Sequence, residues 1–160
     1  MSYRPVALEW YQRAAVVAHG HYRAAMRYAK LNYWFGFPAV VLATIVGTSV
    51  FATLQAKPEF WWQVTVGLMS IAAAILSALQ SFLGYNDKAE RHRVAGSRYN
   101  VVGRELELWL TLPSEDLEKL NSIRTRIDTL AQEAPHIPES VHKHMPSRTG
   151  TMFSSNEQVE

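Results

Sequence analysis

Two long runs without a charged side chain constrain what this chain can fold into. The first lies between Lys30 and Lys57 and has 26 residues, and the second lies between Glu59 and Asp87 and has 27. The hydrocarbon core of a bilayer is about 30 Å thick and needs roughly 20 helical residues, so each run can span it with some tilt. The sequence therefore predicts two membrane-spanning helices joined by a short connection.

Two other interpretations explain the runs less well. Both could be core helices of a soluble protein, but a chain of 160 residues has too little other material to cover them on all sides. A cleaved signal peptide is disfavoured because the first run begins about 30 residues into the chain and is longer than an h-region. The membrane hairpin is the interpretation that we favour.

Basic residues indicate the orientation of this hairpin. Five Lys or Arg precede the first run, five lie between Asp87 and Leu112, and the connection holds only Lys57. The positive-inside rule then predicts that both termini lie in the cytoplasm and that the short connection lies outside. We predict an all-α membrane protein, a two-transmembrane helical hairpin whose helices extend into a cytosolic helical bundle, assembled as an oligomer. The predicted parts are a cytosolic helix over 1–30, spans over 31–54 and 60–86, an outer loop over 55–59, cytosolic helices over 87–134 and a flexible tail over 135–160.

Apolar periodicity predicts how the cytosolic helices pack. Pro113 should end the helix that follows the second run, and we predict that this helix continues the second span without a break to about Leu112. Ser114 is the predicted N-cap of a last helix that ends near Glu133. One face of the first helix is predicted to hold its larger or apolar residues: Tyr11, Ala15, Ala18, Tyr22, Ala25, Ala29 and Tyr33. A heptad-like seam follows the second run: His92, Ala95, Tyr99, Val102, Leu106 and Trp109. The last helix is predicted to bury Leu117, Leu120, Ile123, Ile127 and Leu130.

Polar and small residues inside the two spans are candidates for lining a pore. An unpaired amide in hydrocarbon costs roughly 2–7 kcal/mol, so Gln80 should face another helix, an aqueous lumen or the headgroups. The alternative is that these residues only pack helices together. One hairpin cannot enclose a hole, so a pore would require a homo-oligomer. The pore-lining candidates are Thr44, Thr48, Ser70, Ser77, Gln80, Ser81 and Gly84.

Basic side chains and histidines form the remaining candidates. Six cations flank the spans on the predicted cytosolic side, where they would bind anionic headgroups or a phosphate-bearing ligand: Arg23, Arg27, Lys30, Lys88, Arg91 and Arg93. His92 lies on the predicted seam and should be partly buried. The other five histidines are interpreted as incidental surface residues: His19, His21, His136, His142 and His144.

Several classes of function have no support in the sequence. The chain has no cysteine, which excludes a disulfide framework and a metal site with cysteine ligands. It has no Gly-rich phosphate loop, nucleophile–base pair or paired carboxylates, so we expect neither an enzyme nor a cofactor or metal. A net charge of +2 gives no reason to expect binding to nucleic acid.

Two segments carry a resemblance to a known family. They are "AHGHYRAAMRYAKLNYWFGFPAVVLATIVGTSVF" (18–51) and "LQSFLGYNDKAERHRVAGSRYNVVGRELELWL" (79–110). With the predicted hairpin, they resemble the SLATT family, two-transmembrane effectors associated with nucleotide-signalling bacterial defence operons. The resemblance implies a pore-forming effector of anti-phage defence by abortive infection. It would be triggered by a nucleotide second messenger or a partner defence protein, and would permeabilise the lipid bilayer as a homo-oligomer. The alternative is a membrane-anchored oligomeric scaffold that recruits a cytosolic partner without forming a pore.

Overall fold

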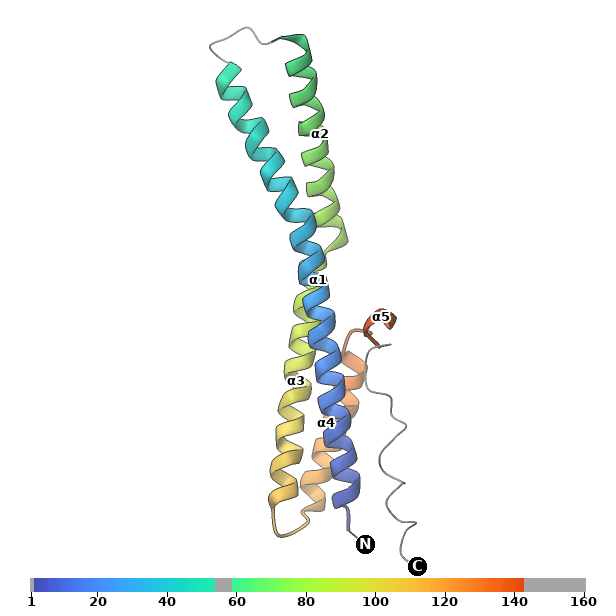
Figure 1. Ribbon diagram of the computed structural model, residues 1–160. Helices are drawn as coiled ribbons and strands as arrows, with labels where there is room; N and C mark the ends of the chain where they lie inside the picture. The colour runs from blue at the N-terminus through green and yellow to red at the C-terminus, as the bar shows by residue number, and fades with distance from the viewer. Residues whose placement is uncertain (1, 54–58, 143–160) are drawn as a thin grey trace, which may run out of the picture. The chain divides into compact units, whose positions relative to one another are not determined.

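The computed structural model describes residues 2–53 and 59–142, and in these ranges the chain is helical, without a strand. Five helices follow one another in Figure 1: α1 (Arg4–Thr53), α2 (Phe60–Leu83), α3 (Tyr85–Thr111), α4 (Leu117–Glu133) and α5 (Glu139–His142). The predicted all-α fold is confirmed. Most of the predicted outer loop over 55–59 and most of the predicted tail lie outside the described residues.

The chain divides into two compact units, Met1–Ala24 with Val94–Glu160, and Ala25–Arg93. We call the first the bundle unit and the second the hairpin unit. In the bundle unit, the start of α1, the later part of α3 and α4 lie side by side (Figure 1). Their core consists of Ala7, Val102, Leu106, Trp109, Leu120 and Ile123. All six residues of the seam predicted between His92 and Trp109 are buried, which confirms that prediction.

The face that α1 turns into the bundle differs from the predicted one. Ala14 and His21 are buried, whereas Ala15 is exposed and Tyr22 is only half-buried. The reason lies on α3, because Tyr99 packs with Ala14 and stacks on the His21 ring at 5.7 Å between ring centroids. The interpretation of His21 as a surface residue was therefore wrong.

The start of α4 also corrects the sequence prediction. Asp116, not Ser114, is the N-cap, and its Oδ1 accepts a hydrogen bond from the backbone N–H of Lys119 at 3.0 Å. Leu120 and Ile123 are buried as predicted, but Leu117 is exposed. The Trp109 indole donates a hydrogen bond to the backbone carbonyl of Asp116 at 2.8 Å. This contact holds Asp116, two residues after Ser114, at the start of α4.

Residues 2 to 4 bind the N-terminal end to Glu115, which lies between α3 and α4, and to the last carbonyls of α3. The Ser2 hydroxyl and the Tyr3 N–H donate to the Glu115 carboxylate at 2.6 and 2.8 Å. These hydrogen bonds, with the positive charge of Arg4, lower the pKa of Glu115. The Arg4 guanidinium also donates to the carbonyl of Leu110 at 2.9 Å, so it satisfies an acceptor that the end of a helix leaves without an intrahelical partner.

Two ion pairs link α3 and α4 crosswise. Arg98 pairs with Glu133 at 2.9 Å, and Arg126 pairs with Glu105. On each helix the arginine and the glutamate are seven residues apart, and the arginine comes first on both helices. The pairs therefore close only when α3 and α4 run antiparallel in this register.

In the hairpin unit, two helical stretches are long and apolar enough to cross a membrane, one in α1 and one that begins at Phe60. The predicted cytosolic helix and first span are one continuous helix, α1, which includes Pro38. The predicted unbroken helix from the second span to Leu112 was wrong. Gly84 adopts a left-handed conformation, with φ 56° and ψ 36°, and separates α2 from α3.

Candidate functional site

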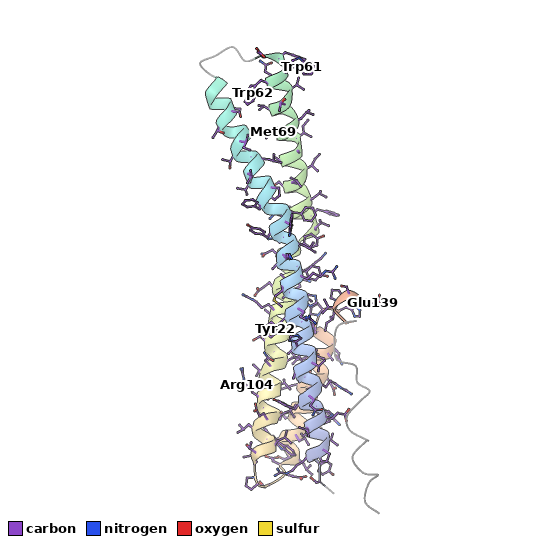
Figure 2. The ribbon with its side chains drawn as sticks, in the orientation of Figure 1. Tyr22, Trp61, Trp62, Met69, Arg104 and Glu139 are labelled. Carbon is purple, nitrogen blue, oxygen red and sulfur yellow. The ribbon has the colours of Figure 1, made fainter. Side chains whose placement is uncertain are left out.

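The helices of the hairpin unit expose most of their apolar side chains. α2 has no buried residue along its whole length. Trp61 and Trp62 lie at its first turn, where Figure 2 labels them, and both are exposed. Apolar surface of this extent needs cover from lipid or from other protein. The two helices are long and apolar enough to cross a membrane.

One face of each helix is covered within the hairpin unit. Half-buried positions of α2 recur at three- and four-residue spacing, and Ala39 of α1 is buried. The covered face of α2 consists of Val66, Met69, Ala73, Leu76, Gln80 and Leu83. Three of the pore-lining candidates, Ser70, Ser77 and Ser81, lie outside it and are exposed.

Gln80 makes a polar contact between α1 and α2. Its Nε2 donates to Oδ1 of Asn32 at 3.4 Å. The amide also lies against the bare backbone of Gly36, one turn further along α1, where a Cβ atom would be only 2.7 Å from Nε2. We call Asn32 and Gln80 the amide latch. Of the three environments predicted for Gln80, the structure shows the contact with another helix.

The threonines of α1 satisfy their hydroxyl groups within their own helix. Thr44 donates to the carbonyl of Val40 at 2.8 Å, and Thr48 donates to the carbonyls of Thr44 and Ile45 at 3.0 Å. A hydroxyl bonded in this way can face lipid at little cost. Thr44 and Thr48 are exposed, so their chemistry does not require a lumen.

The serines of α2 differ in this respect. Within the described residues, the hydroxyls of Ser70, Ser77 and Ser81 make no hydrogen bond, although their helix offers the same backbone carbonyls. A polar group left without a partner in hydrocarbon is costly. This exposed face, which we call the serine face, therefore offers hydroxyl groups that are available to water or to polar groups of another chain.

Aromatic rings from α1 and α3 alternate beside Gly84. The Tyr85 ring stacks on Phe35 at 5.9 Å and on Tyr28 at 6.1 Å between centroids, and Tyr28 stacks on His92 at 5.5 Å. Phe35 and Tyr28 are seven residues apart, as are Tyr85 and His92. His92 is buried, and this burial lowers its pKa. We call these four rings the aromatic column.

The six basic candidates differ in their surroundings. Arg93 pairs with Glu90 at 3.0 Å, and the Lys88 ammonium lies 5.6 Å from the centroid of the Tyr85 ring. Arg23 belongs to the bundle unit, and the other five belong to the hairpin unit. Arg23 and Arg27 are both engaged in interactions. All six side chains are exposed, and Lys30 and Arg91 are the two that make no side-chain interaction within the described residues, so they are the most available to a phosphate group or a lipid headgroup.

His21 is a buried residue of the bundle unit that the sequence interpretation missed. It is only 2% exposed and stacks on Tyr99, whose pKa is raised by burial. A heptad count from Ala7 through Ala14 to His21 and Tyr28 would have found it. Among the described residues, no three His, Cys, Asp or Glu side chains come together as a metal site.

Comparison of the chain with protein-family models, with curated proteins and with solved structures gives no match.

Proposed function

We propose that this chain is the subunit of an oligomeric membrane pore whose lumen is lined by the serine face of α2. The observation that carries the proposal is the contrast in hydrogen bonding between the two spans. The hydroxyls of Thr44 and Thr48 are satisfied by α1 itself, whereas those of Ser70, Ser77 and Ser81 have no partner in the described residues. A water-filled lumen supplies the missing partners.

Several subunits are needed to build such a lumen. The covered face of α2 already packs within its own hairpin unit, so the serine face remains for a symmetry axis. The exposed apolar residues of both spans then meet lipid or neighbouring subunits. In this arrangement Thr44 and Thr48 are not required in the lumen.

The resemblance to SLATT effectors supplies the biological setting of the proposal. The pore would act in the bacterial inner membrane, with both termini in the cytoplasm, and would permeabilise that membrane during phage infection. A nucleotide second messenger or a partner defence protein would act on the helical bundle. Lys30 and Arg91 belong to the hairpin unit, and there they would bind the phosphate of such a messenger or an anionic lipid headgroup.

Dye release from liposomes tests the proposal. Purified protein is reconstituted in calcein-loaded liposomes of mixed neutral and anionic lipid, over a range of protein-to-lipid ratios. We expect release that rises steeply with protein content, as oligomerisation requires. Substituting Ser77→Leu should reduce release at least tenfold, because the apolar side chain removes a polar lining group. Intact oligomers that release no dye at any ratio would refute the pore.

Thr44→Val is the matched control for Ser77→Leu. It removes a hydroxyl from the other span, but one whose hydrogen bond is made within α1. We expect dye release by Thr44→Val to equal that of the unaltered protein. Equal loss in both variants would mean that the serine face has no special role.

A second candidate function is that of a membrane-anchored oligomeric scaffold. In a scaffold, Leu108, which is 65% exposed on α3 of the bundle unit, would contact the cytosolic partner. In a scaffold, Ser77→Leu should leave oligomerisation and dye release unchanged, whereas Leu108→Glu should abolish recruitment of the partner.

A further inference from the structure

The break at Gly84 interrupts the hydrogen bonds that would join α2 to α3. In an unbroken helix, the amides of residues 85 to 87 would donate to the carbonyls of residues 81 to 83. Instead α2 ends at Leu83, and α3 restarts with the Lys88 N–H donating to the Gly84 carbonyl at 3.1 Å. Gly84 has φ 56°, a conformation that glycine adopts without the steric penalty of other residues.

The break brings two distant side chains onto the same side of the chain. Gln80 and His92 are 12 residues apart, which at about 100° per residue would place them about 120° apart around an unbroken helix. Yet both face α1, Gln80 through Asn32 and His92 through Tyr28. The left-handed residue between them resets the helical phase, so that the amide latch and the aromatic column can form together.

Two sets of interactions therefore compete at Gly84. The broken form keeps the latch and the stack of Tyr85 between Phe35 and Tyr28. The unbroken form would restore the backbone hydrogen bonds of a continuous helix but would turn either Gln80 or His92 away from α1. A side chain at position 84 would meet no steric obstacle, because nothing lies within 4 Å of the position that a Cβ atom on Gly84 would occupy, so a substitution there acts through the backbone conformation alone.

We propose that Gly84 is a two-state joint between α2 and α3, held in its broken form by the amide latch and the aromatic column. When α3 turns and the joint becomes helical, the latch parts and α2 rotates against α1. The inference rests on the proposed function in one respect, that rotation of α2 changes what the serine face presents to the lumen. The joint itself does not depend on a pore.

The chemistry of the joint also places it relative to the bilayer. Backbone groups without helical partners are costly in hydrocarbon, and three polar residues follow directly after Tyr85: Asn86, Asp87 and Lys88. The joint therefore lies at the level of the headgroups, where water can solvate the amides and carbonyls that the break releases. A cytosolic event that turns α3 would act on it there.

Amide hydrogen exchange at residues 85 to 87, measured on the full chain in lipid nanodiscs, tests the joint. The unaltered protein and Gly84→Asn should exchange at nearly the rate of an unstructured peptide, because asparagine tolerates the left-handed conformation. Gly84→Ala with Gln80→Leu disfavours that conformation and removes the latch. We expect exchange in this double variant to be at least tenfold slower, with Gly84→Ala alone intermediate.

Gln63→Leu is the matched control for Gln80→Leu, because Gln63 is an exposed amide near the other end of α2. When Gln63→Leu is combined with Gly84→Ala, the amides of residues 85 to 87 should exchange at the same rate as in Gly84→Ala alone. The joint is refuted if these amides are already protected in the unaltered protein, or if the double variant with Gln80→Leu exchanges as fast as the unaltered protein.

Dye release measured on the same samples separates the joint from the pore. Slower exchange together with altered release supports both proposals. Slower exchange with no dye release in any sample supports the joint and refutes the pore. Unchanged exchange refutes the joint, whatever the dye release.

Discussion

The bundle unit and the hairpin unit use the same heptad spacing for different purposes. In the bundle unit, Val102 and Leu106 of α3 are fully buried against α1 and α4. In the hairpin unit, residues of α2 at the same spacing are at most half-buried. Equal periodicity thus gives a complete core where a third helix covers the seam, and an open face where only two helices meet. The stability of the bundle is internal, whereas that of the hairpin depends on its surroundings.

The largest difference between the two units should appear in the free energy of unfolding when one leucine in each unit is replaced by alanine. Leu106→Ala leaves a cavity in the core of the bundle unit and should lower its free energy of unfolding by about 2–5 kcal/mol. Leu68→Ala, on the exposed surface of α2, should change it by less than about 0.5 kcal/mol. Urea unfolding of the full chain in nanodiscs, followed by amide exchange in α2, α3 and α4, measures both. Equal losses would contradict the comparison.

Removing the N-cap of α4 should have a smaller effect, confined to the bundle unit. Asp116→Ala removes the acceptor of the Lys119 N–H and should cost about 1 kcal/mol. Ser114→Ala is the control, since Ser114 lies outside the helix cap, and we expect no measurable change. The same unfolding experiment applies, and a larger loss for Ser114→Ala would restore the original prediction of the cap.

The buried histidine of the hairpin unit, His92, should make the free energy of unfolding depend on pH. Burial lowers the pKa of His92, so as the pH falls the unfolded chain binds the proton before the folded chain does. The stability that this group contributes is therefore full above its ordinary pKa of about 6.5 and is lost as the pH falls below that value. Unfolding measured over a pH series that brackets this value should show the loss, and His92→Phe should reduce it. An unchanged pH profile in His92→Phe would show that another group is responsible.

The smallest effect should come from the crosswise ion pairs of the bundle unit. Arg126→Ala breaks the pair with Glu105, which lies at the surface, and should cost at most about 1 kcal/mol. The loss should shrink in concentrated salt because charges at the surface are screened. Arg124→Ala, which removes a nearby exposed cation, is the control. A salt-independent loss would mean that packing of the arginine stem, not charge, links α3 to α4.

Spacing predicted the parts of the fold that depend on apolar burial. The seam from His92 to Trp109 could be predicted because its residues recur every three or four positions, which places them on one face of a helix. His21 was missed because a polar side chain can be buried when an aromatic partner such as Tyr99 covers it. Asp116 was missed because the Trp109 indole sets the length of the turn through a contact that residue spacing does not reveal.

The break at Gly84 could not be predicted, because the sequence left three environments open for Gln80. The structure shows that Gln80 and His92 both face α1, whereas an unbroken helix would place them about 120° apart. Glycine is the residue that permits the break between them. The partner of Gln80 could be narrowed to a class of environment but not identified, because Asn32 is 48 residues away in the chain.

The attachment of the first residues has a practical consequence for any experiment that needs a fused reporter. Ser2, Tyr3 and Arg4 are bonded to Glu115 and to carbonyls at the end of α3, so a label joined directly before them would start among packed contacts. A fluorescent protein there would compete with the closure of the bundle unit, and a flexible spacer or another attachment point should preserve it. A tag-dependent loss of thermal stability, restored by lengthening the spacer, would reveal how firmly that end is held.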